Sequence, residues 1–397
     1  MGSPRPAKKV ITVAGTNGKG STVAYLAEMS GSLGQRCGTY TSPHILRFNE
    51  RIRIMGEPVS DQQLVEAFSQ VENARENISL TYFEFTTLAA LLIMQQADLD
   101  CAVLEVGLGG RLDTVNLVDA DCAVITPIGL DHQDFLGPDI SSIATEKAGI
   151  IRSGIPVVCT QRKPPGPIMQ VASMSAAKVY RRGHDFDIYE RPGSDLIPGK
   201  KELVFSFGDQ SMTVPRPPLH GDHQVDNLAA ALAALVLMNP ACLTQREVIA
   251  AAIERVRVPG RLQLIHNSPE ILVDVGHNVL AAEAVAEYLA SNNQNDVICV
   301  LAMLADKEAE PVALALDGVC SRWICAGSPG ERGQSGELLA SRIKAALPLA
   351  QVESVRLVVT AIEKALLLAG GTNTILIFGS FSTAAAAFDC TLESPQY

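Results

Sequence analysis

Short runs of β-branched and apolar residues alternate with longer stretches of helical periodicity along most of the chain of 397 residues. Alternation of this kind is typical of the α/β class, in which parallel sheets are covered by helices. The predicted strands are 10–14, 101–106, 123–126, 156–159, 271–274, 297–301, 323–325 and 374–378. The predicted helices are 21–33, 61–72, 85–96, 141–151, 224–237, 244–255, 281–291, 336–346, 355–368 and 383–388.

Two segments interrupt this alternation. Residues 160–220 hold eight prolines and a short alternating run at 202–207, which predicts irregular structure with a small antiparallel hairpin. Residues 257–261, Arg-Val-Pro-Gly-Arg, separate two regular patterns and predict a linker. We therefore expect one domain over 1–258 and a second, smaller α/β domain over 259–397.

The turn after the first predicted strand carries a glycine-rich phosphate-binding pattern. Residues 13–21 read V-A-G-T-N-G-K-G-S and precede the first predicted helix. Glycines let a backbone wrap a phosphate, the amides at a helix start point at it, and Lys19 adds a cation. The usual pattern is G-x-x-x-x-G-K-[ST], whereas here Val13 holds the first glycine position and Gly20 separates Lys19 from Ser21. The alternative is an ordinary glycine-rich turn. The combination of strand, turn, lysine, hydroxyl and helix favours a site for a nucleoside triphosphate.

Composition narrows the function classes. The net charge of −11 argues against non-specific nucleic-acid binding. The nine cysteines have no pairing or zinc spacing, and several lie in apolar runs, which is typical of buried thiols in a reducing compartment. No apolar run reaches the length of about 18 residues that a membrane helix needs, and the basic residues 1–9 lead directly into the phosphate loop. We expect a soluble, cytoplasmic protein, with Trp323 in its core.

A second group of polar residues follows other predicted strands. The run 101–105 ends in Glu105, and three glycines, Arg111 and Asp113 come after it. A carboxylate at the carboxyl end of a strand suits magnesium, although a lone glutamate there more often caps a loop amide. Taken alone, His132 reads as a polar loop residue and Lys147 as a solvated helix lysine. The pair His220 and His223 has zinc-like spacing, but no third ligand is in spacing, so we favour a helix-entry loop.

Taken together, these segments resemble the folate branch of the Mur ligase superfamily, the dihydrofolate synthase/folylpolyglutamate synthase family. The similarity runs from about residue 8 to 385, and the family's motifs occur in one order. They are the loop 15–21, the segment 41–44 with Arg47 and 50–52, then 81–84, 105–113, 130–132, 146–149, 220–224 with Asn227, 259–261, 274–278 and 379–381.

The resemblance implies an α/β fold made of an N-terminal P-loop mononucleotide-binding domain and a smaller C-terminal Rossmann-like domain. It also implies roles for individual residues. The ATP-binding residues would be Asn17, Gly18, Lys19, Gly20, Ser21, Asn227, Arg261 and Asp274. The pterin-binding residues would be Thr81, Tyr82, Phe83, Glu84, Leu112, Asp113 and Thr114, and the glutamate-binding residues His277 and Ser380. Two magnesium ions would be held by Ser42 and Glu105 and by His132 and Lys147, with Lys147 carrying CO₂ as a carbamate. Lys19, Lys147, His132 and Glu105 would be catalytic.

The implied reaction is ATP-dependent addition of L-glutamate to dihydropteroate and to tetrahydrofolate through an acyl phosphate. Such an enzyme uses only small-molecule substrates, binds neither nucleic acid nor membrane, and is expected to be a monomer; a monovalent cation requirement stays open. Family members usually carry several tens of residues before the phosphate-loop strand, including a loop that touches the pterin, so the affinity for dihydropteroate is left open here. A cell-wall Mur-type amino-acid ligase and a P-loop ATPase or switch are the alternatives. Against the switch, we find no apolar strand that ends in a Walker B aspartate.

Overall fold

The computed structural model describes residues 5–192, 201–371 and 373–391. The chain divides into two compact units, one made of Met1–Pro218 with Gln224–Val256 and the other of Leu219–His223 with Arg257–Tyr397. The domain boundary between residues 258 and 259 remains a prediction. The chain passes for the last time from the first unit to the second after Val256. No helix among the described residues combines the length and the apolar character needed to cross a membrane. Both units are mixed α/β, so the predicted fold class is confirmed.

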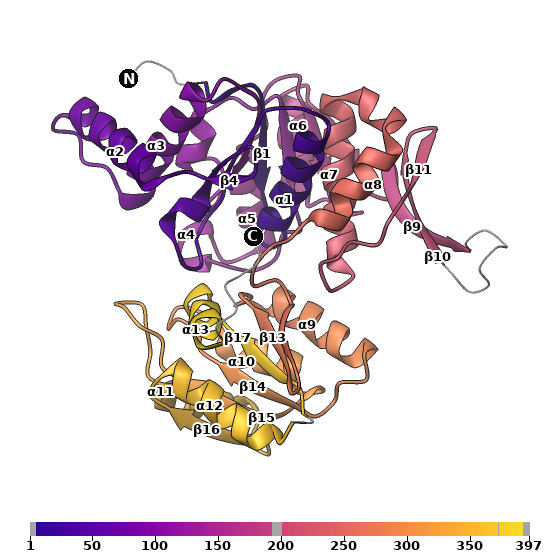
Figure 1. Ribbon diagram of the computed structural model, residues 1–397. Helices are drawn as coiled ribbons and strands as arrows, with labels where there is room; N and C mark the ends of the chain where they lie inside the picture. The colour runs from indigo at the N-terminus through magenta and orange to yellow at the C-terminus, as the bar shows by residue number, and fades with distance from the viewer. Residues whose placement is uncertain (1–4, 193–200, 372, 392–397) are drawn as a thin grey trace. The chain divides into compact units, whose positions relative to one another are not determined.

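The first unit is built on an eight-stranded sheet of order β4-β3-β2-β5-β1-β6-β7-β8. Strands β1 and β4 of this sheet are labelled in Figure 1. From β2 to β8 all neighbouring strands are parallel, and β3 and β4 add an antiparallel edge. All carboxyl ends of the parallel strands therefore meet at one edge of the sheet. The strands are β1 (Ala7–Ala14), β2 (Cys37–Tyr40), β3 (Ile52–Ile54), β4 (Glu57–Pro58), β5 (Leu99–Glu105), β6 (Cys122–Ile125), β7 (Pro156–Cys159) and β8 (Lys178–Arg181).

Helices bury both faces of this sheet, which explains the continuous apolar runs of its central strands. On one face, Val10 packs in a cluster with α2 and α3, and Ala14 packs in a cluster with α5 and α6. Ile11 and Val13 alternate with them and are also buried. Helix α1 contacts β1, β2 and β5, and α8 packs on α1. The helices are α1 (Lys19–Ser32), α2 (Asp61–Arg75), α3 (Tyr82–Gln96), α4 (Gln133–Leu136), α5 (Ile140–Ala148), α6 (Gly166–Met174), α7 (His223–Met238) and α8 (Arg246–Arg255), with 3₁₀ turns η1 (Phe48–Arg51), η2 (Thr114–Leu117) and η3 (Pro240–Thr244).

The proline-rich segment is more regular than the sequence predicts. The expected hairpin is present as β10 (Lys201–Phe207) with β11 (Gln210–Val214), and β9 (Phe186–Pro192) adds a third antiparallel strand. Irregular structure is wrong for residues 166–181, which form α6 and β8. Pro165 and Pro167 stand at the start of α6, where a missing N–H leaves no helical hydrogen bond unmade, so they begin the helix instead of breaking it.

The second unit holds a six-stranded sheet of order β12-β13-β17-β14-β15-β16, in which only β12 is antiparallel to its neighbour. Trp323 on β15 is fully buried in a cluster that includes Leu301 and Phe378, which confirms its predicted place in the core. The strands are β12 (Gln263–Asn267), β13 (Glu270–Asp274), β14 (Val297–Leu301), β15 (Cys320–Ala326), β16 (Gln351–Val355) and β17 (Ile375–Phe378). The helices are α9 (Val279–Ser291), α10 (Ala309–Leu316), α11 (Gly336–Ala346), α12 (Val358–Ala369) and α13 (Phe381–Thr391).

Candidate functional site

The carboxyl edge of the first sheet gathers polar residues from four neighbouring strands. Ser42 follows β2, Glu105 ends β5, the glycine-rich loop follows β1, and His132 follows β6. The four strands are adjacent in the order β2-β5-β1-β6. Because they are parallel, residues that follow them lie along one edge, where ligands bind in open α/β sheets.

The glycine-rich loop is held in one conformation by its neighbours. Gly15 has φ +153°, and a Cβ there would lie 1.8 Å from the Thr126 hydroxyl oxygen. Gly18 has φ +86°, and a Cβ there would lie 2.3 Å from Oδ1 of Asn227. Asn227, on α7, therefore lies against the phosphate loop, which is where its predicted role in binding ATP requires it. The loop leads directly into α1 at Lys19, so the amides of the first helical turn are available to an anion.

Two lysine amines converge on one carbonyl oxygen of this loop. Lys19 Nζ donates to the Gly15 oxygen at 3.2 Å and to the Thr16 oxygen at 3.1 Å. Lys147 Nζ, from the last turn of α5, donates to the same Gly15 oxygen at 2.8 Å. The sequence alone favoured a solvated lysine at position 147, and this is wrong because its side chain is buried, with 4% exposed.

Burial changes the chemistry of Lys147. Burial and, to a smaller extent, the Lys19 charge lower the pKa of the amine to about 7, while Asp131 and Asp113 act in the opposite direction. An amine with such a pKa is substantially neutral near physiological pH and is therefore a nucleophile. This is the form that can add CO₂ to give a carbamate.

Oxygen donors lie along the same edge of the sheet. Glu105 is buried and accepts a hydrogen bond at 3.2 Å from the Ser42 backbone N–H. Asp131, whose side chain is 10% exposed, accepts from the His132 backbone N–H at 2.9 Å, and the His132 ring nitrogen Nε2 lies 3.8 Å from the Asp131 carboxylate. Carboxylate and hydroxyl oxygens are the ligands that Mg²⁺ prefers, so Ser42, Glu105 and Asp131 fit that ion, and Lys147 fits it as a carbamate.

Of the predicted pterin-binding residues, 81–84 form the start of α3. Thr81 Oγ1 accepts from the Glu84 backbone N–H at 3.2 Å, and Glu84 Oε2 accepts from the Thr81 N–H at 2.6 Å. These hydrogen bonds lower the pKa of Glu84, so the carboxylate stays ionised. Tyr82 is 62% exposed. The Phe83 ring lies so close to Gly107 that a Cβ there would be 2.5 Å from it, so this residue packs against the loop after β5.

The other pterin-binding candidates lie on that same loop. Leu112 is 79% exposed, and Thr114 begins η2. Asp113 accepts hydrogen bonds from the Leu108 N–H at 2.8 Å and the Val115 N–H at 2.9 Å. Burial raises the pKa of Asp113, and these hydrogen bonds and Lys19 oppose that rise. The fold thus brings the two predicted pterin segments together beside the phosphate loop.

Four candidates lie in the second unit, at the carboxyl edge of its own sheet. Asp274 accepts from the backbone N–H groups of Leu262 at 2.8 Å and Gly276 at 2.6 Å. The His277 ring nitrogen Nδ1 lies 3.1 Å from the Val275 oxygen. Ser380 directly precedes α13 and accepts from the Thr383 N–H at 3.1 Å, and the Arg261 guanidinium lies 5.9 Å from the centre of the Phe381 ring. Asp274, His277, Ser380 and Arg261 are thus collected on one unit, and the phosphate loop belongs to the other.

The histidines at 220 and 223 behave as a helix-entry loop. His223 begins α7, and the His220 ring lies 5.2 Å from the ring of Tyr288. Burial lowers the pKa of both histidines. Among the described residues, no group of three potential metal ligands includes this pair, so nothing supports the zinc alternative.

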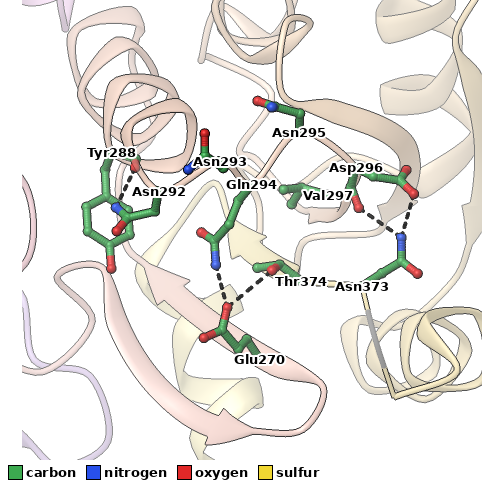
Figure 2. Close-up of a pocket in the computed structure, with 10 residues that line it drawn as sticks. All are labelled: Glu270, Tyr288, Asn292, Asn293, Gln294, Asn295, Asp296, Val297, Asn373 and Thr374. Atoms are coloured by element: carbon green, nitrogen blue, oxygen red, sulfur yellow. Dashed lines mark hydrogen bonds between the residues drawn. The ribbon is translucent and has the colours of Figure 1, made fainter.

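A cavity of about 750 Å³ lies at the opposite edge of the second sheet (Figure 2). Its lining includes Glu270 and Val297, which begin β13 and β14, and Thr374, which directly precedes β17. Amide side chains dominate it, and Asn373 Nδ2 donates to Asp296 Oδ2 at 2.7 Å. Because this is the amino edge, the cavity is separate from Asp274, His277 and Ser380.

Sequence reasoning left Asp131, Arg111 and Glu146 without roles. Asp131 acts electrostatically on Lys147, and Arg111 pairs with Glu146, the residue before Lys147. All three lie inside the motifs 105–113, 130–132 and 146–149, so these motifs could have indicated that the three residues belong to the site. Their side chains alone did not indicate what they contact.

Comparisons with known proteins agree with this architecture. The family model for the Mur ligase middle domain matches residues 13–235, and that for the Mur ligase glutamate ligase domain matches residues 260–381. The dihydrofolate synthase/folylpolyglutamate synthase of Escherichia coli strain K12 is 39% identical over 388 residues, which is 97% of this chain and 87% of that protein.

Solved structures are similar over nearly the whole chain. The bifunctional folylpolyglutamate synthase/dihydrofolate synthase of Yersinia pestis, complexed with AMPPNP and Mn ion, aligns with a TM-score of 0.89 at 37% identity, covering 98% of this chain and 90% of that one. E. coli FolC in complex with DHPP and ADP aligns with the same TM-score and identity, covering 98% and 89%.

Proposed function

Because this chain belongs to the Mur ligase family, and within it to the dihydrofolate synthase/folylpolyglutamate synthases, we propose that it joins L-glutamate to 7,8-dihydropteroate and to the γ-carboxylate of tetrahydrofolate, with ATP as co-substrate. One observation carries the proposal. The buried Lys147 amine lies 2.8 Å from the Gly15 oxygen of the phosphate loop, on the same unit as the two predicted pterin segments.

The chemistry consists of two transfers. The substrate carboxylate attacks the γ-phosphorus of ATP, the bond to the bridging oxygen breaks, and an acyl phosphate and ADP form. The neutral amine of glutamate then attacks the acyl carbon, loses a proton and expels phosphate. Lys19 offsets the negative charge on the phosphates in the first transfer. Exclusion of water protects the acyl phosphate from hydrolysis.

The residues around the loop have separate tasks. Asn17, Gly18, Lys19, Gly20 and Ser21 hold the phosphates through backbone amides and side chains, and Asn227 contacts the nucleotide from α7. Two magnesium ions would be held by Ser42 and Glu105 and by His132 with Lys147 as its carbamate. When bound, they supply Lewis-acid stabilisation of the phosphate oxygens.

The substrates are recognised by the remaining candidates. Thr81, Tyr82, Phe83 and Glu84 with Leu112, Asp113 and Thr114 bind the pterin, where the Phe83 ring offers an apolar surface and carboxylates accept from ring nitrogens. In the second unit, Arg261 and Asp274 contact ATP, and His277 and Ser380 bind glutamate. We further propose a monomer in a reducing, cytoplasmic compartment, consistent with eight buried free thiols, and leave a monovalent cation as a variable to test.

The test is glutamate-dependent phosphate release from MgATP, measured in parallel with dihydropteroate and with tetrahydrofolate. Turnover with both supports the bifunctional enzyme, and turnover with tetrahydrofolate alone restricts the proposal to polyglutamate extension. Lys19→Ala is expected to lose activity, while Lys344→Ala, at an exposed position in the second unit, is the matched control. Full activity of Lys19→Ala overturns the mechanism. Phosphate release without glutamate favours an ATPase, and ligation only of UDP-sugar substrates favours a cell-wall ligase.

A further inference from the structure

The loop after β5 is fastened to the helical turn that carries Lys147. The Arg111 backbone N–H donates to the Glu146 carbonyl oxygen at 2.7 Å. The Arg111 side chain then donates twice to Glu146 Oε1, from Nε at 3.1 Å and from Nη2 at 2.9 Å. Three hydrogen bonds therefore join two residues that lie 35 positions apart in the chain.

Two glycines allow this close approach. A Cβ on Gly110 would lie 2.7 Å from the Glu146 oxygen and 3.1 Å from Cα of Lys147. A Cβ on Gly149 would lie 2.3 Å from Cβ of Arg111. The backbones of the loop and of the last turn of α5 are thus in direct contact, with no side chain between them.

A second layer holds this junction from the other side. Asn116 Nδ2 donates to the Arg111 oxygen at 3.1 Å and to the Gly149 oxygen at 3.0 Å. Arg152 donates to the Asn116 backbone oxygen at 2.7 Å and to its Oδ1 at 2.9 Å. Hydrogen bonds among these four residues therefore link the loop to the helix end.

Reactive groups lie on both sides of the junction. The loop carries Asp113, which lies close enough to Lys147 to act on it electrostatically. The helix carries Lys147, whose amine contacts the phosphate loop. We propose that Arg111 is a positioning residue, which through Glu146 holds the Lys147 side chain at a set place between the phosphate loop and the Asp113 loop. This inference rests on the proposed function, because Lys147 matters only if the site carries out the ligation.

The exposure of the pair makes the proposal testable. The Arg111 side chain is 54% exposed and the Glu146 side chain 22%, so the ion pair contributes little to global stability. A small displacement of a group in a reaction site, in contrast, costs rate steeply. A positioning role therefore predicts a large loss of kcat at a nearly unchanged melting temperature.

The experiment compares Arg111→Ala, Glu146→Ala and the double variant with a matched pair elsewhere in the unit. Arg75 and Glu72, at the end of α2, also form two side-chain hydrogen bonds, at 2.6 and 2.7 Å, and belong to no proposed site. For each variant, steady-state kinetics give kcat, the KM for ATP and the Mg²⁺ concentration for half-maximal activity. Thermal unfolding reports stability, and ¹³C NMR in labelled bicarbonate reports the lysine carbamate.

We expect Arg111→Ala to lower kcat or raise the Mg²⁺ requirement by about 10- to 100-fold, as loss of a group that supports a metal ligand does. The KM for ATP should stay nearly unchanged, the carbamate signal should fall, and Glu146→Ala should behave alike. The double variant should be no worse than either single one, and Glu146→Gln, which keeps an oxygen acceptor, should recover activity.

The opposite results overturn the inference in different ways. If Arg111→Ala has the same kinetics as the control Arg75→Ala, Arg111 does not position Lys147. The same conclusion follows if kcat falls only in proportion to the fraction of protein that is folded. Additive effects in the double variant refute action through Glu146. If the unmutated protein itself shows no glutamate-dependent turnover, the proposed function fails and the positioning of Lys147 loses its purpose.

Discussion

Replacing Lys147 by methionine should abolish ligation and yet stabilise the protein at low pH. Burial lowers the pKa of this amine from 10.5 to about 7. Between those two pH values the unfolded chain binds a proton that the folded protein does not, so folding loses stability as the pH falls through that window. The destabilisation is complete below pH 7 and absent above pH 10.5. A methionine of similar length carries no such charge.

The magnitude follows from the two pKa values. At 1.36 kcal/mol for each pH unit, the amine destabilises the folded state by about 5 kcal/mol at pH 6 and by about 2 kcal/mol at pH 9. The lost hydrogen bond to the Gly15 oxygen costs about 1 kcal/mol at both pH values. Lys147→Met should therefore be more stable than the unmutated protein by about 4 kcal/mol at pH 6 and by about 1 kcal/mol at pH 9.

Urea unfolding in CO₂-free buffer at both pH values measures this difference, with Lys344→Met as the exposed-lysine control. Fluorescence and circular dichroism should be compared, because two units need not unfold together. A stability difference that is the same at pH 6 and pH 9 would refute the argument that burial makes Lys147 titrate near neutrality. Retained ligation by Lys147→Met would separately refute its role in the site.

Three further predictions follow from single contacts. Gly15→Ala should lose nucleotide binding, as measured by calorimetry, because its Cβ would lie 1.8 Å from the Thr126 hydroxyl. Gly34→Ala, at φ +80° with open space around it, is the control and should bind the nucleotide normally. Trp323→Ala should lower the free energy of unfolding by about 3–5 kcal/mol in urea titrations, because the side chain is fully buried, and a cost below about 1 kcal/mol would contradict that. Asp274→Ala should lower the free energy of unfolding by about 1–3 kcal/mol, because a buried N–H group loses its acceptor, and Asp274→Asn should recover part of this loss. Equal losses in both variants would argue against the hydrogen bonds as the cause.

Most buried strands were predictable from the sequence, but the short buried strand β2 and the edge strands of the two large sheets were not. The runs that became β1, β5, β14 and β17 are almost wholly buried, so their apolar residues are continuous. The sequence analysis missed β16, Gln-Val-Glu-Ser-Val, at the edge of its sheet, where every side chain is at least partly exposed. Such a strand needs no apolar residues, because its neighbour supplies the pairing.

Short helices posed a different problem. Helix α10 has only eight residues, and its outer face carries Leu314, which is 58% exposed, and Ala315, so few polar residues mark the helical period of its four buried ones. The proline-rich start of α6 misled in the opposite direction, because proline breaks a helix in its interior and suits its first turn. For both α10 and α6, the surroundings of the segment in the folded chain, and not its local sequence, determined that it forms a helix.

The residues of the candidate site also fall into some that were predictable from the sequence and some that were not. Residues such as Lys19 and Glu105 stand beside recognisable turns and strand ends, so their chemistry could be predicted locally. The burial of Lys147 depends on a contact with the Gly15 backbone oxygen, 132 positions away, and a backbone atom has no residue type to recognise. Arg111 and Glu146 meet across 35 positions, so only the folded chain relates them.

The distribution of thiols gives this protein a built-in attachment point. All nine cysteines lie in the described part of the chain, eight of them buried and only Cys390 exposed. Burial and the neighbouring Asp389 and Glu363 raise the pKa of Cys390, so maleimide coupling proceeds best at mildly alkaline pH. A single fluorophore can thus be placed on α13 of the unmutated protein. Ser380 directly precedes α13 and Cys390 lies near the end of that helix, so the emission is expected to change on addition of glutamate if Ser380 takes its proposed part in glutamate binding.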